Sequence, residues 1–451
     1  MTDDALIIAR VLFWILTAGV AFLPMRWATF CLVLASHIDI TSLTFASATS
    51  VGFENTVRIA VLPLLFLARA HFLPLRQIQW TLPHKLWFAF TVYAAIAGFW
   101  GGFPLSSVKL VAYLVAYFIL YRIFCTAWAE GWLDIGMMRL LSWCVVALAV
   151  VQTYGLGDGW GGPELRFTTF STPQYFAAFL VAMLAILVFS GSRGVLHYAT
   201  CGVLMTAILI SGSRYVFVSA VLLLIIASFR VVSEDGEAVQ LGISFRKVLL
   251  ALGIAAVCVI GLISYAPDNR IDQLVDVASD QDKTVADVGT FAWRIAIYYD
   301  IWNKLEIRRP AELFFGSGTC SGAALMVERD PEHHDLQDID GNRSLHSEYL
   351  RALYEWGILG LVLMVTFLAV TIAAFSRKVV AQHGGPALAF LGALPSILIG
   401  LAIENILAGA ASAAGVGILL AMSFAWQTDP DYFYQPIEEG GFVPESPALQ
   451  A

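Results

Sequence analysis

Residues 344–361, SLHSEYLRALYEWGILGL, place a histidine, two glutamates and an arginine directly before an apolar run. On a helix, His346, Tyr349 or Leu350, Leu353 and Gly357 would share one face. An imidazole changes its charge near neutral pH and can accept a proton from a hydroxyl group. His346 is therefore a candidate general base, and a hydrogen-bonded structural histidine is the alternative interpretation.

The charged residues of this segment fall on a different face of the same predicted helix. Arg351 follows Glu348 by three residues and precedes Glu355 by four, so its guanidinium can bridge both carboxylates. We interpret the three as a solvated ladder of ion pairs. His333 and His334 lie in an Asp-rich run and are expected at the surface.

A second polar position is ISGSRYVF, residues 210–217. A single helix over 195–229 would be about 52 Å long, against a hydrocarbon core of about 30 Å. The chain must therefore turn at Ser-Gly-Ser-Arg, which places Arg214 near the edge of the hydrocarbon. An arginine there is costly unless it meets a partner or a water-filled cavity. Snorkelling of Arg214 to the headgroups is the alternative.

A third position is FAWRIAIYYDIWNKLEIRRPAELFFGSGTCSG, residues 291–322. Arg294 and several large side chains recur at helical spacing, which predicts an amphipathic helix. Pro310 cannot continue this helix, and the Gly-Ser-Gly at 316–318 predicts a turn. The alternative is a helix that rests on the bilayer without chemistry, with the arginines at 308–309 in contact with headgroups.

Together the three positions predict a chemistry that none of them indicates alone. Arg214 and Arg294 can hold a phosphate or pyrophosphate through planar, charge-assisted hydrogen bonds. His346 can accept a proton from an attacking hydroxyl. Because guanidinium groups would carry the charge of the leaving group, this chemistry requires no metal ion. The sequence has no Gly-rich nucleotide cradle, so a soluble nucleotide-activated donor is not expected.

The composition indicates whether these residues belong to a soluble or a membrane protein. The chain has 451 residues, of which 59% are hydrophobic and 13% are charged, with a mean hydropathy of +0.76. Soluble domains carry about 25% charged residues. Repeated apolar runs long enough to span a bilayer predict an all-α polytopic transmembrane helical bundle rather than a barrel. The first run lacks a basic leader and a cleavage site, so we expect a retained helix. The cysteines show no disulfide or metal spacing.

Four regions follow from the pattern. Residues 1–266 hold ten apolar segments, 267–351 form one mainly helical hydrophilic loop, 352–426 hold three more segments, and 427–451 are a disordered tail. This predicts about 12–13 spans. Basic residues in three short loops place the long loop on the outer side and the tail in the cytoplasm. The same count places the N-terminus outside, unless one of the first two segments is re-entrant or the two are one helix.

Several motifs occur in an order that resembles a known superfamily. They are SGSR ending at Arg214, RFTTFSTPQYFA at 166–177, the Arg294-led helix with its Pro and Gly-x-Gly turn, and HSEYLRALYEWGILGL. Gln174 and Ser347 stand where asparagine is usual. From about residue 137 to 375 the chain resembles the O-antigen ligase and O-antigen/exopolysaccharide polymerase superfamily. These are bacterial inner-membrane enzymes that use undecaprenyl-diphosphate-linked glycans on the periplasmic side.

The resemblance implies roles for individual residues. Arg214 and Arg294 would bind the pyrophosphate of the donor, and His346 would be the base for the acceptor hydroxyl. Arg166, Tyr349 and Glu355 match supporting positions. The implied reaction is metal-independent glycosyl transfer without a cofactor. The expected partners are membrane lipids, lipid-linked oligosaccharides as donor and acceptor, and chain-length regulator or export proteins, without nucleic acid.

Charge favours one reaction over another within this superfamily. Residues 267–349 hold 16 Asp and Glu but only 8 Arg and Lys. A ligase must receive a phosphorylated lipid A-core, which suits a basic surface, so the acidic loop favours a polymerase. A ligase and a protein O-oligosaccharyltransferase remain alternatives. A transporter of lipid-linked glycans is the rival from another class, and its intramembrane acids would be Asp39 and Glu404.

Overall fold

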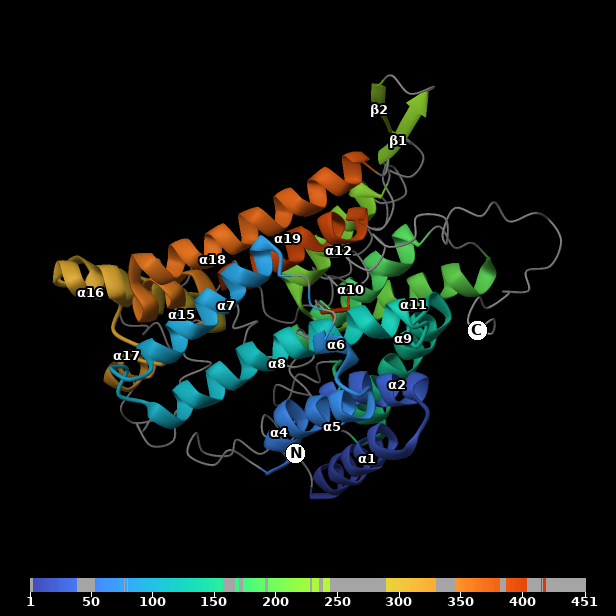
Figure 1. Ribbon diagram of the computed structural model, residues 1–451, viewed down its shortest axis with the longest axis horizontal. Coiled ribbons are helices and arrows are strands. Elements are labelled where there is room, and N and C mark those ends of the chain that lie inside the picture. The colour runs from blue at the N-terminus through green and yellow to red at the C-terminus, as the bar shows by residue number, and fades with distance from the viewer. Residues whose placement is uncertain are drawn as a thin grey trace.

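The fold is described here from a computed structural model (Figure 1). Its described residues are 3–38, 53–76, 78, 80–156, 167–169, 173–190, 194–227, 229–234, 238–243, 289–329, 345–381, 387–403, 415, 417 and 418. Several predictions concern residues outside these ranges: the apolar segment 246–266, most of 405–426, the tail 427–451, and Asp39, Arg166, His333, His334 and Glu404.

The N-terminal part consists of α1 (Asp3–Phe22), α2 (Met25–Ser36), a continuous helical stretch of α4 (Phe53–Thr56), the π-helical η1 (Val57–Val61) and α5 (Leu62–Arg69), and then α6 (Leu73–Arg76). Pro24 precedes α2 with an extended backbone, so α1 and α2 are two helices rather than one divided helix. The Arg69 guanidinium donates to the carbonyls of Val20 and Leu23. The turn between α1 and α2 therefore lies at the same end of the bundle as the basic loop after α5.

The next helices include the 26-residue α8. They are α7 (Leu82–Ala97), α8 (Pro104–Ala129), α9 (Ile135–Val150) and the π-helical η2 (Val151–Gly155). Asp134 caps α9 by accepting a hydrogen bond from the Met137 N–H at 2.6 Å, and it also pairs with Arg26 at 2.7 Å. These contacts place the start of α9 beside the start of α2.

The central helix of the bundle is α10 (Pro173–Phe189), which is followed by α11 (Val195–Ile210) and α12 (Arg214–Ile226). Almost every α10 side chain is buried, as expected for a helix that is apolar on all sides and enclosed by others. The predicted turn before Arg214 is present, and Gly212 has a φ of 68° there. A small antiparallel hairpin of β1 (Phe229–Glu234) and β2 (Ala238–Ile243) is an addition to the predicted all-α class.

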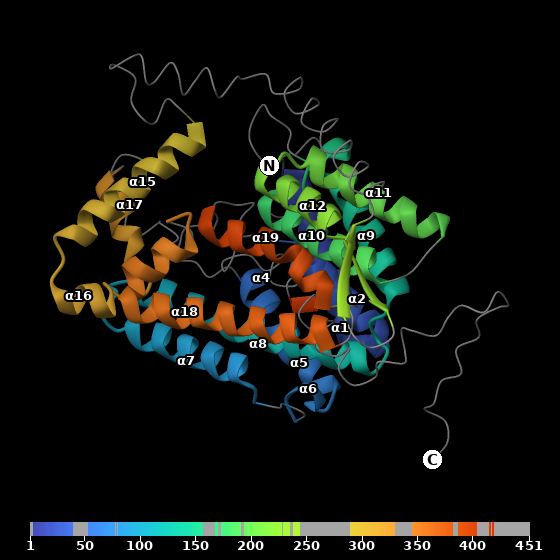
Figure 2. The ribbon, with the colours of Figure 1, turned by 90° about the horizontal axis from the view of Figure 1, so that it is seen from above.

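The remaining helices are α15 (Gly289–Glu306), α16 (Pro310–Phe315), α17 (Gly322–Arg329), α18 (Glu348–Ala381) and α19 (Ala387–Ile403). Helices α15 to α17 gather around the first turns of α18 at one end of the molecule, whereas the rest of α18 runs along α7 and α19 (Figures 1 and 2). This arrangement brings the predicted Arg294 helix to the start of α18.

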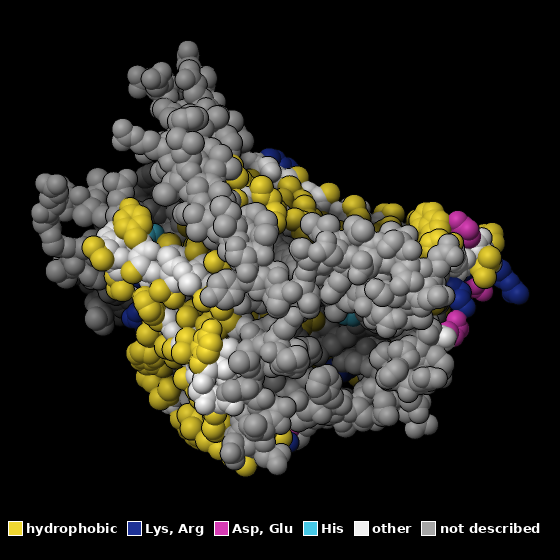
Figure 3. Space-filling model, turned by 180° about the vertical axis from the view of Figure 1, so that it is seen from behind, with side chains coloured by type: hydrophobic (Ala, Val, Ile, Leu, Met, Phe, Trp, Pro, Cys, Tyr) yellow, Lys and Arg dark blue, Asp and Glu magenta, His cyan; other side chains and the backbone are white. Residues whose placement is uncertain are grey.

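The described part of the chain has three helical stretches long and apolar enough to cross a membrane: Pro104–Ala129, Ile135–Gly155 and Glu348–Arg377. Six shorter apolar helices accompany them. Many large apolar side chains are exposed among the described residues, and Figure 3 shows them gathered over part of one face; Phe22, Val108 and Val195 are among the most exposed. The protein is therefore an all-α helical membrane protein, as predicted.

Candidate functional site

His346 lies just before α18 rather than on it. The helix begins at Glu348, and His346 has a φ of 48°, in the left-handed region. Gly357, with a φ of 66° and a ψ of −167°, interrupts α18 after its first turns. The prediction that His346 and Gly357 share one helical face is therefore wrong. The physical reason is close packing, because a Cβ atom on Gly357 would lie 2.4 Å from the Phe314 carbonyl oxygen.

Helix α15 carries Arg294 to His346. The Tyr298 hydroxyl, one turn after Arg294, donates a hydrogen bond to the His346 carbonyl at 2.8 Å. The same hydroxyl lies 3.4 Å from the Ala402 carbonyl at the end of α19. One phenol thus connects the Arg294 helix, the segment before α18 and the end of α19.

The electrostatic environment keeps His346 neutral. Burial, reinforced by the positive charge of Arg294, lowers the pKa of His346 to about 3. At neutral pH the imidazole is therefore uncharged and can accept a proton, although its low pKa makes it a weak base.

Apolar packing holds α15 in this position. Ile297, Ile301 and Leu305 form its buried face and pack against residues of α17 and α18. Tyr299 and Trp302 lie on the other face and are 66% and 56% exposed. The predicted amphipathic helix is confirmed, and it ends at Glu306, before Pro310.

The ion pairs of α18 are buried. Glu348, Arg351 and Glu355 are each at most 1% exposed. The Arg351 guanidinium lies 3.2 Å from the Glu355 carboxylate and 3.6 Å from that of Glu348. Our interpretation of a solvated ladder is wrong, because residues 316–322, called the glycine loop below, cover this face of α18.

The Glu355 carboxylate binds the backbone of the glycine loop. It accepts hydrogen bonds from the N–H groups of Cys320 at 2.8 Å and Gly322 at 3.3 Å. Charge-assisted bonds of this kind offset part of the cost of burying a carboxylate. Glu355 thereby fixes the start of α17 to α18, and its observed role is structural.

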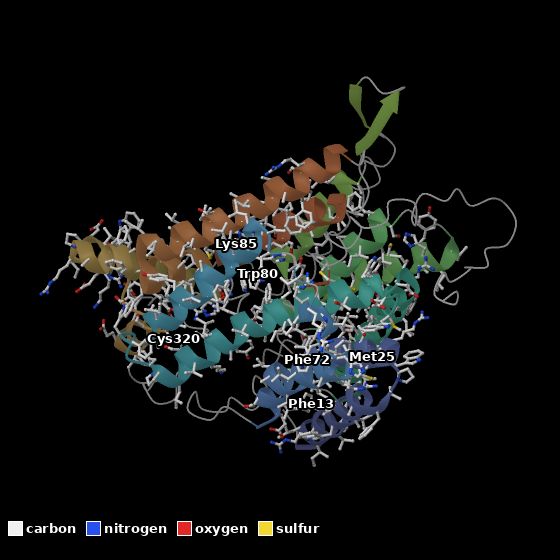
Figure 4. All side chains as sticks on the ribbon, in the orientation of Figure 1. Phe13, Met25, Phe72, Trp80, Lys85 and Cys320 are labelled. Carbon is white, nitrogen blue, oxygen red and sulfur yellow. The ribbon has the colours of Figure 1, made fainter. Side chains whose placement is uncertain are left out.

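The glycine loop also packs directly on α7. Gly318 lies so close to Gly101 that a Cβ atom on Gly318 would be 2.4 Å from the Gly101 Cα atom. The Thr319 hydroxyl donates to the Ala94 carbonyl at 2.5 Å and accepts from the Trp356 indole at 2.9 Å. Cys320 lies near one end of α7, opposite the end that Trp80 and Lys85 mark (Figure 4).

Arg308 has a structural position rather than the headgroup contact of the alternative interpretation. Its guanidinium donates to the Tyr354 carbonyl at 2.8 Å and to the Ser317 hydroxyl at 2.6 Å, and it lies 3.9 Å above the Tyr354 ring. Arg309 is exposed at the start of α16. The two neighbouring arginines therefore differ, and only Arg309 is open to solvent or headgroups.

Of the other predicted site residues, some lie near His346 and others lie wholly or partly outside the described part of the chain. Arg214 is the first residue of α12, and its side chain lies outside the described part of the chain, as does all of Arg166. Tyr349 is half-buried against the core between α7 and α18. The structure thus brings Arg294 and His346 together and positions Tyr349 and Glu355 nearby.

Sequence reasoning missed two residues of this region. The helical spacing places Tyr298 on the Arg294 helix. It does not show that Tyr298 donates a hydrogen bond to His346, because spacing indicates the face of a residue and not its partner. Arg58 was missed within the apolar segment 57–73, although a charged residue inside such a run is a signal of function. No three described His, Cys, Asp or Glu side chains are grouped as metal ligands would be.

This is a helical membrane protein in which an arginine and a neutral histidine converge at one end of the bundle. A family model described as O-Antigen ligase matches residues 178–365. Over these residues the chain is similar to the O-antigen ligase and polymerase superfamily, whose members are glycosyltransferase-like enzymes, and the match supports the resemblance seen in the sequence. The matched range includes Arg214, Arg294 and His346. No curated protein matches the chain.

Proposed function

We propose that this protein is a polysaccharide polymerase. It transfers a glycan from undecaprenyl diphosphate to a sugar hydroxyl of a second lipid-linked glycan, on the periplasmic side of the inner membrane. The observation that carries this proposal is the pairing of Arg294 with a neutral His346 through the Tyr298 hydrogen bond. The family match over the same residues supports it.

The reaction requires one bond to break and one to form at the same carbon. The acceptor oxygen attacks the anomeric carbon of the donor while the bond from that carbon to the diphosphate oxygen breaks. The proton of the attacking hydroxyl passes to the imidazole of His346. Arg294 and Arg214 stabilise the negative charge that develops on the departing undecaprenyl diphosphate.

Donor binding would also activate the base. After burial, the charge of Arg294 is the second cause of the low pKa of His346. An incoming diphosphate compensates the charge of Arg294, so the pKa of His346 rises towards its ordinary value of about 6.5. His346 therefore becomes a stronger base when the donor is bound, while burial, the larger cause, continues to hold its pKa low.

A groove between α15 and α17 offers a place for sugars. Its volume is about 390 Å³, and it is lined by Asp300, Asn303, Lys304, Ile307, Leu325 and Glu328. Carboxylate, amide and ammonium groups match the hydroxyls of a glycan. The groove adjoins the helix that carries Arg294, so a glycan attached to a diphosphate at Arg294 can extend into it.

The acidic character of residues 267–349 favours polymerisation over ligation. Exposed glutamates at positions 306, 312 and 328 contribute to this charge on the described helices. A phosphorylated lipid A-core would be repelled by such a surface, whereas a neutral repeat unit would not.

The decisive experiment supplies purified full-length protein with a defined undecaprenyl-diphosphate-linked repeat unit and measures product mass. Products that grow by whole repeat units on the lipid support the polymerase. Transfer only when lipid A-core is added would establish a ligase instead. Movement of the substrate across a vesicle membrane without a new glycosidic bond would establish a transporter and overturn the proposal.

A further inference from the structure

An apolar patch is exposed at the end of the molecule that carries α16. Its centre is the aromatic pair Phe314 and Phe315, which are 45% and 48% exposed and have ring centroids 4.9 Å apart. Ile307, which precedes α16, is 82% exposed. Figure 3 shows hydrophobic side chains directly beside charged ones at this end of the molecule. An exposed patch of this kind indicates contact with a partner or with lipid.

The patch occupies one face of α16. Ala311, Phe314 and Phe315 are all exposed and share this face at helical spacing. Leu313 lies on the other side and packs against the apolar cluster of α15, α17 and α18. Glu312 is also exposed, but it lies two residues before Phe314 and therefore about 200° around the helix from it. The open face of α16 is thus apolar and is bordered by one acidic residue.

Close contacts fix α16 to two long helices of the bundle. The Tyr93 hydroxyl, one turn before the end of α7, donates to the Phe315 carbonyl at 2.8 Å and lies 3.1 Å from the Trp356 carbonyl. The Phe314 carbonyl lies so near α18 that a Cβ atom on Gly357 would be 2.4 Å from it. Phe314 and Phe315 therefore lie at the level of Gly357 on α18 and of the last turn of α7.

The length of α18 gives the depth of this level in a bilayer. Twenty residues separate Gly357 from the exposed Arg377. A helix of this length rises about 30 Å, which equals the thickness of the hydrocarbon core. With Arg377 at the headgroups of one leaflet, Gly357 lies at the edge of the hydrocarbon in the other. Any tilt of α18 would place Gly357 deeper.

The exposed faces of α7 and α18 continue the patch into the membrane. On both helices, exposed apolar residues recur every three or four positions, as expected for a lipid-facing stripe. These residues are Phe88, Val92 and Ile96 on α7, and Ile358, Val362 and Val365 on α18. The apolar face of α16 is therefore the end of a larger apolar surface that two membrane helices share.

We propose that α16 is an interfacial anchor, which inserts Phe314 and Phe315 among the acyl chains of the leaflet opposite Arg377. The basic loops predict that this is the outer leaflet. Aromatic side chains are favoured at this depth, and the exposed Arg309 at the start of α16 can reach headgroup phosphates. Because Arg308 binds both α18 and the glycine loop, the anchor is rigid and holds the end of α15 at the membrane surface.

The test identifies what touches Phe314 in a bilayer. The photoreactive residue p-benzoylphenylalanine replaces Phe314 in the full-length protein, which is placed in phosphatidylcholine vesicles, irradiated and analysed by mass spectrometry. A covalent phospholipid adduct is expected, with a yield similar to that of the same residue at Val362 in the stripe of α18. A mass of two chains would show that a second copy covers the patch, and the absence of any adduct would show that it faces water. Either result overturns the proposal.

Glu312 provides the matched control on the same helix. The photoreactive residue at position 312 is expected to give about tenfold less adduct than at position 314, because the polar side of an interfacial helix faces water. Equal yields at the two positions would show that lipid surrounds α16 without insertion of one face, which overturns the anchor. The same residue at Phe315 repeats the measurement, so the proposal stays testable if the change at Phe314 prevents folding.

Discussion

The Tyr298 hydroxyl donates a hydrogen bond to the His346 carbonyl, which joins two residues 48 positions apart in the chain. The bond fixes the backbone of His346 in a left-handed conformation that a histidine rarely adopts. Arg294 lies one turn earlier on the same helix as Tyr298. The geometry of the candidate base is therefore supplied by the helix that carries the candidate cation.

Substitution of Tyr298 tests this relationship. Tyr298→Phe removes one partly buried hydrogen bond, which is worth about 1 kcal/mol of folding stability. We expect polymerisation to fall about tenfold, because His346 is no longer held against Arg294. In vitro turnover and thermal unfolding together measure the two effects. Tyr299→Phe is the control, since Tyr299 is adjacent but 66% exposed, and equal losses in both variants would contradict the positioning role.

Arg294→Lys tests the need for a planar guanidinium. Lysine keeps the positive charge but cannot form paired hydrogen bonds to a diphosphate. Removal of one preorganised charge stabiliser lowers the rate by about 10²–10³. We expect polymer to disappear from cells while protein abundance stays unchanged, whereas the exposed Arg309→Lys keeps normal polymer. Normal polymer length in Arg294→Lys would refute the assignment.

Glu355→Gln tests the attachment of the glycine loop to α18. The change leaves Arg351 with one carboxylate fewer and weakens the bonds from Cys320 and Gly322. Breaking a buried ion pair costs about 3–5 kcal/mol, so the melting temperature in detergent should fall clearly. Glu312→Gln, an exposed change on α16, should leave it unchanged. A melting temperature equal to the wild type would show that the buried triad does not stabilise the protein.

The pH dependence of stability follows from His346. Its pKa is about 3 in the folded protein, below the ordinary value of about 6.5. The unfolded chain therefore takes up a proton first, so this contribution to stability is complete above pH 6.5 and is lost as the pH falls towards 3. His346→Gln should flatten the stability profile in this range. An identical profile in the variant would contradict the low pKa.

Metal removal tests the chemistry of the leaving group. If guanidinium groups carry the charge of undecaprenyl diphosphate, turnover in excess EDTA should equal turnover without it. Loss of activity that one added divalent ion restores would show that a metal takes part.

The sequence predicted most helices accurately, because apolar length and helical spacing are local properties. The two helices around Ser211–Ser213 and the amphipathic helix of Arg294 are examples. It also identified the residue types at the site. An arginine or a histidine beside an apolar run costs free energy, so its presence there indicates a function. It misjudged the environment of Glu348, Arg351 and Glu355, because nothing in the helix itself shows what covers its faces.

The sequence by itself determined that this is a helical membrane protein and that cations and one histidine collect at a few places. Only the tertiary structure decided that Glu355 is buried, that Tyr298 holds His346, and that Thr319 binds the Ala94 carbonyl. These relationships join residues tens to hundreds of positions apart. They depend on how helices pack, and packing is decided by the fit of whole surfaces rather than by the pattern of any one segment.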